Sequence, residues 1–144
     1  MEDNGCVFCD IVHKRIDSYM VYQNEYATTF LDRYPIADGH VLVVPNKHVE
    51  TLDQLGDVKI ANELMQAVIG AAKLLMKAGV CSDYSILQDN GEHAEQDIKH
   101  VHFHIIPRHA NDHVRSNLET DENARQEESK VKIYNRLIAT NGGI

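Results

Sequence analysis

The sequence lacks three features that would each indicate a class of protein. It has no apolar run approaching the roughly 20 residues that a membrane-spanning helix requires. Its acidic beginning, MEDNGCVFCD, has no apolar core and does not resemble a secretory signal peptide. Its three cysteines are an odd number without the dense spacing of a disulfide scaffold. We therefore expect a protein of the reducing cell interior, in the cytoplasm or nucleus, with no membrane partner.

Positive charge is also scarce. The 14 Lys and Arg residues stand against 22 Asp and Glu, which gives a formal net charge of −8. Binding along a nucleic-acid backbone needs a basic surface, so we expect no nucleic-acid partner. A small anionic ligand in a local pocket remains compatible with this charge. A chain of 144 residues with 43% hydrophobic content is long enough to bury a core.

Alternating and β-branched segments predict a sheet. The five expected strands are at residues 19–24, 26–32, 40–45, 84–88 and 98–107. Because short links join most neighbouring strands, we predict an α+β fold with a five-stranded antiparallel meander, interrupted between the third and fourth strands by one long helix.

The long helix is predicted from Asp57 to Ala78, where apolar residues recur at helical spacing and Gly79 stands at a common stopping point. The expected apolar stripe consists of Ala61, Leu64, Met65, Val68, Ala71, Ala72 and Leu75. Beyond Arg108 the composition becomes strongly polar. We divide the chain into a domain at residues 1–110 and a polar C-terminal extension at 111–144, with a terminal helix near residues 131–140.

Three histidines stand at every second position of KHVHFHIIPR: His100, His102 and His104. Successive side chains of a strand point to opposite faces, so the imidazoles should share one face and the intervening apolar side chains the other. Alternate strand residues lie roughly 6.5 Å apart, which lets several imidazoles surround one small group. Imidazole is also a nucleophile and an acid–base group near neutral pH. The stretch predicts a metal site, a catalytic site, or both.

This stretch is similar to the signature of the histidine-triad (HIT) family, and the resemblance covers about residues 6–108. FLDRYPIADGHVLVVPNKH, residues 30–48, resembles a second family block, and LQDNGEHAEQDIKHVHFHIIPR, residues 87–108, resembles the closing segment. The resemblance implies a histidine-triad domain within residues 1–110 and a homodimer with joined sheets. It also implies hydrolysis of purine nucleoside phosphoramidates, of the adenosine 5′-monophosphoramidase type, to AMP or GMP.

The resemblance assigns roles to four histidines. It makes His102 the nucleophile that forms a covalent nucleotidyl-histidine, and it makes His104 the residue that hydrogen-bonds the phosphate or the departing group. By the same analogy, His100 steadies the site or ligates a metal, and His40 sits behind the triad and helps to set its protonation. The alternative is that these imidazoles only satisfy hydrogen bonds or bind metal passively.

Three further residues match substrate-binding positions of the family. Asp32 would accept hydrogen bonds from ribose hydroxyls, Asn90 would contact the ribose–phosphate region, and Gln96 would lie near the leaving group. Asp32 could instead cap a strand end, and Asn90 could be an ordinary turn residue. Candidates for an apolar slot around the base are Ile36, Leu42 and Phe30, with a core role favoured for Phe30.

Asp97 departs from the family members that carry Ser or Thr at this position. An ionised carboxylate can only accept hydrogen bonds, so it would repel a phosphate if it pointed inward. Either Asp97 turns away from the phosphate, or turnover is slower than in hydroxyl-bearing relatives. We do not count it among the catalytic residues.

Cys6 and Cys9 have the C-x-x-C spacing of zinc and redox sites. A closed zinc site needs four ligands and the chain has no second cysteine pair, so two histidines must complete it. The zinc-binding branch of the family implies His48 and His100, giving a structural zinc site that takes no part in the chemistry at phosphorus. The alternative is a pair of reduced thiols near the surface.

Two other functions remain open on the sequence. One is hydrolysis of dinucleoside polyphosphates by the same fold and mechanism, which the N-terminal cysteine pair makes the second choice. The other is a nucleotide- or zinc-binding interaction module with little catalysis, which Asp97 and the polar extension motivate.

Overall fold

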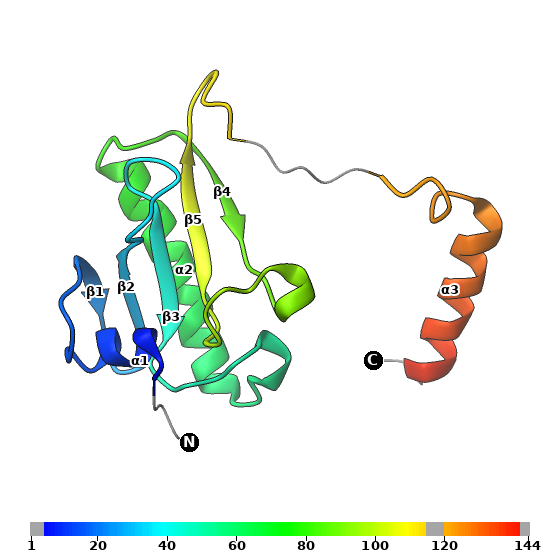
Figure 1. The fold of residues 1–144 in the computed structure, drawn as a ribbon, viewed down its shortest axis with the longest axis horizontal. Coiled ribbons are helices and arrows are strands. Elements are labelled where there is room, and N and C mark those ends of the chain that lie inside the picture. The colour runs from blue at the N-terminus through cyan, green and yellow to red at the C-terminus, as the bar shows by residue number, and fades with distance from the viewer. Residues whose placement is uncertain (1–4, 115–119, 142–144) are drawn as a thin grey trace. The chain divides into compact units, whose positions relative to one another are not determined.

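The computed structural model describes residues 5–114 and 120–141 of the chain. It divides into two compact units, Met1–His113 and Val114–Ile144. The first unit holds the sheet with helices α1 (Val7–Val12) and α2 (Val58–Lys77), and the second holds α3 (Glu127–Asn141) (Figure 1). The predicted terminal helix near residues 131–140 lies within α3. The predicted division at residue 110 remains a prediction.

Within the described residues the sheet has five strands: β1 (Met20–Gln23), β2 (Ala27–Leu31), β3 (Val41–Pro45), β4 (Asp83–Leu87) and β5 (Phe103–Arg108). Every neighbouring pair is antiparallel. The predicted α+β class and the antiparallel character of the sheet are confirmed.

The strand order corrects one detail of the predicted meander. The order is β1-β2-β3-β5-β4, so β5 lies between β3 and β4. Because β3 and β4 each pair antiparallel with β5, they run parallel to one another. Parallel strands cannot be joined by a tight turn, and α2 makes the crossover between them. The place left open between β3 and β4 is then filled by β5 (Figure 1).

Helix α2 begins and ends where the sequence indicates. The Asp57 side chain accepts a hydrogen bond from the Ile60 N–H at 3.1 Å, and Gly79 follows the helix with a φ of 75°. The buried face consists of Leu64, Ala67, Val68, Ala71, Ala72 and Leu75. Met65, predicted for this face, is 47% exposed, because it lies about 100° around the helix from Leu64.

The two faces of the sheet are covered by different helices. Val41, Val43 and Ile105 pack in one cluster with the buried face of α2. On the opposite face, Leu42 and Val44 pack in a second cluster with three α1 residues, Phe8, Ile11 and Val12. The alternation along β3 therefore sends odd-numbered side chains toward α2 and even-numbered ones toward α1.

The histidine stretch enters the sheet later than predicted. Residues 98–107 were expected to form the fifth strand, yet β5 begins at Phe103. The preceding chain runs beside the segment that follows β3, where the Val101 N–H donates to the Val49 carbonyl at 2.8 Å. The alternation still holds, since Val101 and Phe103 join the α2 cluster.

The described residues contain no helix long and apolar enough to cross a bilayer.

Candidate active site and metal centre

A pocket of about 750 Å³ lies on the α1 face of the sheet. Its walls combine apolar residues of α1 and β2 with polar residues of the loop after β2 and of the histidine stretch. Its lining includes Phe8, Ile11, Tyr19, Phe30, Asp32, Arg33, Tyr34, Leu42, Asp97, Ile98, His102 and His104. The pocket is large enough for a nucleotide-sized ligand.

His102 presents a nitrogen lone pair to this pocket. Its Nδ1 lies 2.7 Å from the His100 carbonyl oxygen. Because a carbonyl oxygen can only accept, Nδ1 must carry the proton, and Nε2 of the neutral ring is the unprotonated nitrogen. The ring of Phe8 packs edge-on against the imidazole, with centroids 5.0 Å apart, and holds its plane. The side chain is buried except at the pocket.

His104 presents an N–H to the pocket instead of a lone pair, because its other ring nitrogen accepts a hydrogen bond from His40. The Ile36 N–H donates to His40 Nδ1 at 3.0 Å, so the proton of a neutral His40 is on Nε2. His40 Nε2 lies 2.9 Å from His104 Nδ1 and therefore donates to it. This leaves the proton of a neutral His104 on its Nε2. His102 and His104, whose ring centroids are 5.0 Å apart, thus offer a lone pair and an N–H side by side.

Asp32 supports this histidine pair from the loop after β2. One carboxylate oxygen accepts from the Tyr34 N–H at 2.8 Å, which makes Asp32 a local cap as well as a pocket residue. The other oxygen lies 3.4 Å from His40 Nε2 and 3.8 Å from His104 Nδ1. Burial lowers the pKa of both histidines, while the negative charge of Asp32 partly offsets that effect.

Asn90 and Gln96, predicted to contact the substrate, are not among the lining residues of the pocket. Asn90 Oδ1 accepts from the Leu52 N–H at 2.8 Å. Gln96 Oε1 accepts from the Gly91 N–H at 2.7 Å, and its Nε2 donates to the carbonyls of Glu50 and Ile98. Both side chains hold together the loops that lead into the histidine stretch.

The predicted apolar slot is only partly present. Phe30 and Leu42 are buried and line the pocket, so each serves the core and the pocket at once. Ile36 is 53% exposed and lies outside the lining, and its contribution to the site is its backbone N–H, which donates to His40 Nδ1. Sequence reasoning missed Phe8 and Ile11, which form a wall of the pocket. The sequence signal that could have identified them is their place beside Cys6 and Cys9, in a short segment that alternates cysteines with apolar residues.

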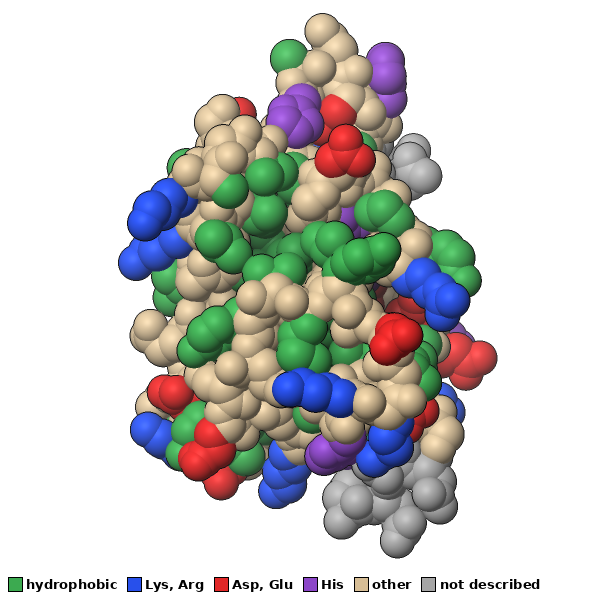
Figure 2. Space-filling view, turned by 90° about the vertical axis from the view of Figure 1, so that its left-hand side faces the viewer, with side chains coloured by type: hydrophobic (Ala, Val, Ile, Leu, Met, Phe, Trp, Pro, Cys, Tyr) green, Lys and Arg blue, Asp and Glu red, His purple; other side chains and the backbone are tan. Residues whose placement is uncertain are grey.

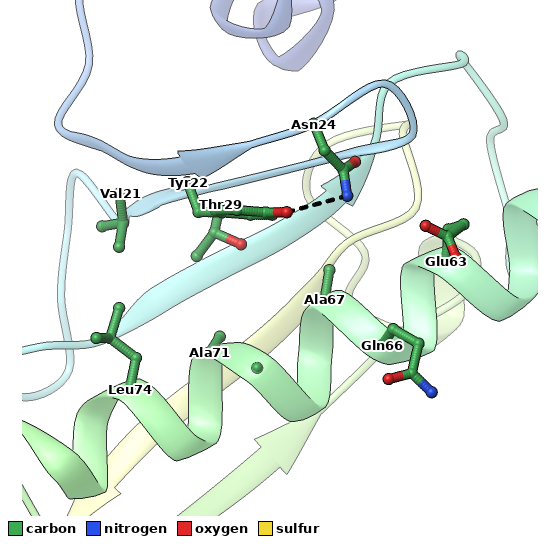
Figure 3. Close-up of a pocket in the computed structure, with 10 residues that line it drawn as sticks. Val21, Tyr22, Asn24, Thr29, Glu63, Gln66, Ala67, Ala71 and Leu74 are labelled. Carbon is green, nitrogen blue, oxygen red and sulfur yellow. Dashed lines mark hydrogen bonds between the residues drawn. The ribbon is translucent and has the colours of Figure 1, made fainter.

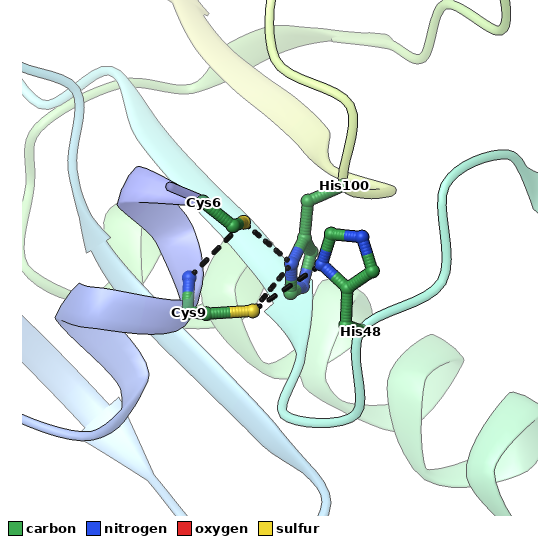
Figure 4. Close-up of side chains that lie close together, drawn as sticks. All are labelled: Cys6, Cys9, His48 and His100. Carbon is green, nitrogen blue, oxygen red and sulfur yellow. Dashed lines mark hydrogen bonds between the residues drawn. The ribbon is translucent and has the colours of Figure 1, made fainter. Parts of the chain in front are cut away.

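Cys6, Cys9, His48 and His100 converge on one point, and their ligand atoms lie within 4.8 Å of one another. Figure 4 shows the two cysteines reaching from α1 toward the two imidazoles. His100 Nε2 donates to the Pro45 carbonyl at 2.8 Å, so Nδ1 is its unprotonated nitrogen. That nitrogen lies 3.4 Å from Cys6 Sγ and 3.5 Å from Cys9 Sγ. Burial lowers the pKa of His100 to about 4, which keeps it neutral and able to ligate.

Asp32, His40 and His104 also form a close group of ligand-type atoms. The hydrogen bonds of His40 argue against a second metal centre in this group. His40 Nδ1 already accepts from the Ile36 N–H, so a metal at Nε2 would leave the ring with no proton on either nitrogen. This group is a hydrogen-bonded relay, and it differs in that respect from the cysteine-containing cluster.

A second, smaller hollow of about 420 Å³ lies between the β1–β2 hairpin and α2. Figure 3 shows Ala67, Ala71 and Leu74 of α2 facing Val21 and the strands across it. Its lining holds no histidine or cysteine. Figure 2 shows the face of the molecule beyond β1, where hydrophobic side chains gather across the middle with charged side chains among and around them. We assign no chemistry to this hollow.

Comparison with known proteins places these features in a family. Residues 13–111 match the HIT domain. An uncharacterized HIT-like protein of Methanocaldococcus jannaschii is 41% identical over 107 residues, covering 74% of this chain and 81% of that protein. An adenosine 5′-monophosphoramidase of Saccharomyces cerevisiae is 38% identical over 106 residues, covering 74% of this chain and 64% of the yeast protein.

Solved structures agree with the sequence matches. A HIT family protein from Bacillus subtilis superposes with a TM-score of 0.85 at 28% identity, covering 94% of this chain and 96% of that one. A histidine triad nucleotide-binding protein from Candida albicans gives a TM-score of 0.73 at 28% identity, covering 94% of this chain and 99% of that one. The match extends beyond the triad to the whole sheet and α2.

Proposed function

The chain belongs to the HIT domain family, and from this premise we propose that it hydrolyses purine nucleoside phosphoramidates through a covalent nucleotidyl-histidine. One observation carries the proposal: His102 and His104 face the pocket with complementary protonation, a lone pair on one Nε2 and an N–H on the other. A nucleophile beside a proton donor is the pair of groups that displacement of an amine from phosphorus requires.

The proposed reaction has two displacements. In the first, the His102 Nε2 lone pair forms a bond to the α-phosphorus as the bond from phosphorus to the amine nitrogen breaks. The departing amine takes up a proton, for which His104 supplies its Nε2–H. In the second, water forms a bond to phosphorus as the Nε2–phosphorus bond breaks, and AMP or GMP is released. His104 then recovers its proton from that water.

The surrounding residues receive roles that fit this scheme. We propose that His40 holds His104 in the tautomer that donates toward the pocket. Asp32 can still accept ribose hydroxyls, because each carboxylate oxygen has more than one acceptor site. Asn90 and Gln96 would act by shaping the loops near the pocket, since their side chains hydrogen-bond to the backbone of those loops. Phe8, Phe30 and Leu42 offer apolar surface to a base.

We further propose that the cysteine–histidine cluster binds zinc. In a tetrahedral site with bonds of about 2.3 Å to sulfur and 2.0 Å to nitrogen, adjacent sulfur and nitrogen atoms stand about 3.5 Å apart. The three short sulfur–nitrogen distances in the cluster are 3.3, 3.4 and 3.5 Å. Zinc would fix α1 against the histidine stretch, and through Phe8 it would support the pocket wall. All four ligands come from the protein, so the ion would be structural.

We also propose a homodimer with the sheets joined side by side. Edge strand β4 carries Tyr84, Ile86 and Leu87, which are 40%, 48% and 43% exposed. An edge with this much apolar surface would be protected by a second copy. Light scattering coupled to gel filtration would test this, and a monomer mass across a wide concentration range would refute it.

The activity is tested by AMP release from adenosine 5′-phosphoramidate by the purified protein and by His102→Ala. We expect release to be lost in the variant. The native protein, quenched during turnover, should carry an adduct of about 329 Da on the His102 peptide, the mass of AMP less water. If both proteins are inert while both bind AMP, the hydrolase proposal fails and a nucleotide-binding module is favoured. Diadenosine tetraphosphate tests the polyphosphate alternative in the same assay.

A further inference from the structure

The geometry points to Asp97 as a residue that sorts phosphate ligands by charge. We propose that its carboxylate disfavours dianionic and polyanionic phosphates, and so restricts the pocket to substrates whose phosphate carries a single negative charge. The inference rests on the function proposed above and deepens it, because it names the substrate class that the same pocket selects.

The position of Asp97 relative to the nucleophile is the first support. Its Oδ1 lies 3.4 Å from His102 Nε2, the nitrogen that carries the lone pair. A phosphorus atom ready for attack stands about 3–3.5 Å from that nitrogen, which places it within about 7 Å of the carboxylate. The side chain therefore lies toward the reacting group, and the option that it turns away does not describe this structure.

The second support is that no Lys or Arg of the described residues neutralises the carboxylate. Its Oδ1 accepts from the Ile98 N–H at 2.9 Å. Among the residues that the structure describes, no Lys or Arg forms a salt bridge with Asp97. The acidic residues of the pocket lining are Asp17, Asp32 and Asp97, against a single cation, Arg33. A phosphate in this pocket meets a surplus of negative charge.

The third support is that the backbone around Asp97 is fixed on both sides. Gln96 Nε2 donates to the carbonyls of Glu50 and Ile98, at 2.8 and 2.9 Å. The Ile98 side chain packs against the apolar cluster of the α1 face. The loop therefore holds the Asp97 backbone beside His102, and the exposed side chain, 75% accessible, lies with its Oδ1 3.4 Å from His102 Nε2.

Because the competing ligands differ in negative charge, a carboxylate at this position would make the pocket selective among them. A phosphoramidate ester has one ionisable oxygen and carries one negative charge, whereas AMP approaches two at about pH 8. Polyphosphates carry more. At about 7 Å and with the screening of an exposed site, each additional negative charge weakens binding about three- to tenfold. Asp97 would thus favour the substrate over the product AMP and over dinucleoside polyphosphates.

The test compares AMP with adenosine, which lacks the phosphate. Dissociation constants of both are measured by calorimetry at about pH 8 for the native chain, Asp97→Asn and Asp97→Ser. Asp53→Asn, an exposed position outside the pocket, makes the same change in net charge and serves as the matched control. We expect both Asp97 variants to bind AMP three- to tenfold or more tightly, with adenosine unchanged and with no effect in the control. A kinetic readout should agree, with diadenosine tetraphosphate turnover rising relative to phosphoramidate turnover in Asp97→Asn.

The outcomes separate the two proposals. If the native chain binds AMP and the Asp97 variants bind it no more tightly, the charge-sorting role is wrong and the proposed function stands. If AMP and adenosine affinities change together, Asp97 acts on the shape of the pocket and the charge-sorting role is again wrong. A native chain that binds neither ligand overturns both proposals.

Discussion

His40 Nε2 lies 2.9 Å from His104 Nδ1, so a buried ring behind the pocket decides which nitrogen of His104 carries the proton. We expect His40→Ala to reduce kcat about 10- to 100-fold with little change in KM, because a positioned proton donor contributes about 10²–10⁴-fold. His40→Gln, whose amide N–H can replace the Nε2–H, should recover part of the loss. Steady-state kinetics of both variants tests this, and an unchanged kcat in His40→Ala would refute the relay.

The same burial predicts that stability depends on pH. Burial lowers the pKa of His40 and His104 in the folded protein, while both titrate near about 6.5 when unfolded. Below that pH the unfolded state binds more protons, so the stability these neutral rings contribute is complete above about pH 6.5 and is lost as the pH falls. Each group contributes a slope of about 1.4 kcal/mol per pH unit.

Urea unfolding from about pH 7.5 to about pH 5 measures this slope. The native chain should lose stability toward acid, and His40→Asn should lose less, since one group no longer contributes. Equal slopes in the two proteins would show that His40 is not responsible.

Removal of the proposed zinc should loosen α1. Three of the contacts that fix its N-terminal turn involve Cys6 and Cys9. A strong chelator should lower the melting temperature by several degrees, because a tightly bound ion contributes about 4 kcal/mol at a thousandfold excess over its dissociation constant. Cys9→Ser should lose the metal, as measured by elemental analysis. Cys81→Ala changes a buried cysteine outside the cluster and should keep the metal.

Gly39 should tolerate no side chain, because it combines a φ of 87° with a close neighbour. A Cβ added there would lie 2.7 Å from Val80 Cγ1, whereas one added at Gly79, with a φ of 75°, would meet nothing within 4 Å. We expect Gly79→Ala to cost about 1 kcal/mol of unfolding free energy. Gly39→Ala should cost about 2–4 kcal/mol, since the clash adds to the strain. Equal losses in the two variants would show that the contact with Val80 is easily relieved.

The sequence predicts the elements better than their arrangement. Helical spacing and Gly79 identify α2 to within one residue at each end, because these signals are local. The place of β5 between β3 and β4 is set by pairing between distant segments, which local periodicity does not contain. The four predicted metal ligands do converge. The hydrogen bonds of Gln96 to the carbonyls of Glu50 and Ile98 depend on how the loops fold, which a sequence pattern does not contain.

The alternation that brings the imidazoles together also limits how this segment can vary. His100 faces the cysteines, His102 and His104 face the pocket, and Val101 and Phe103 fill the core beneath. A single residue inserted or deleted here would exchange the two faces, sending imidazoles into the apolar core and valine toward the cysteines. The distance between His100 and His104 is therefore fixed at four residues.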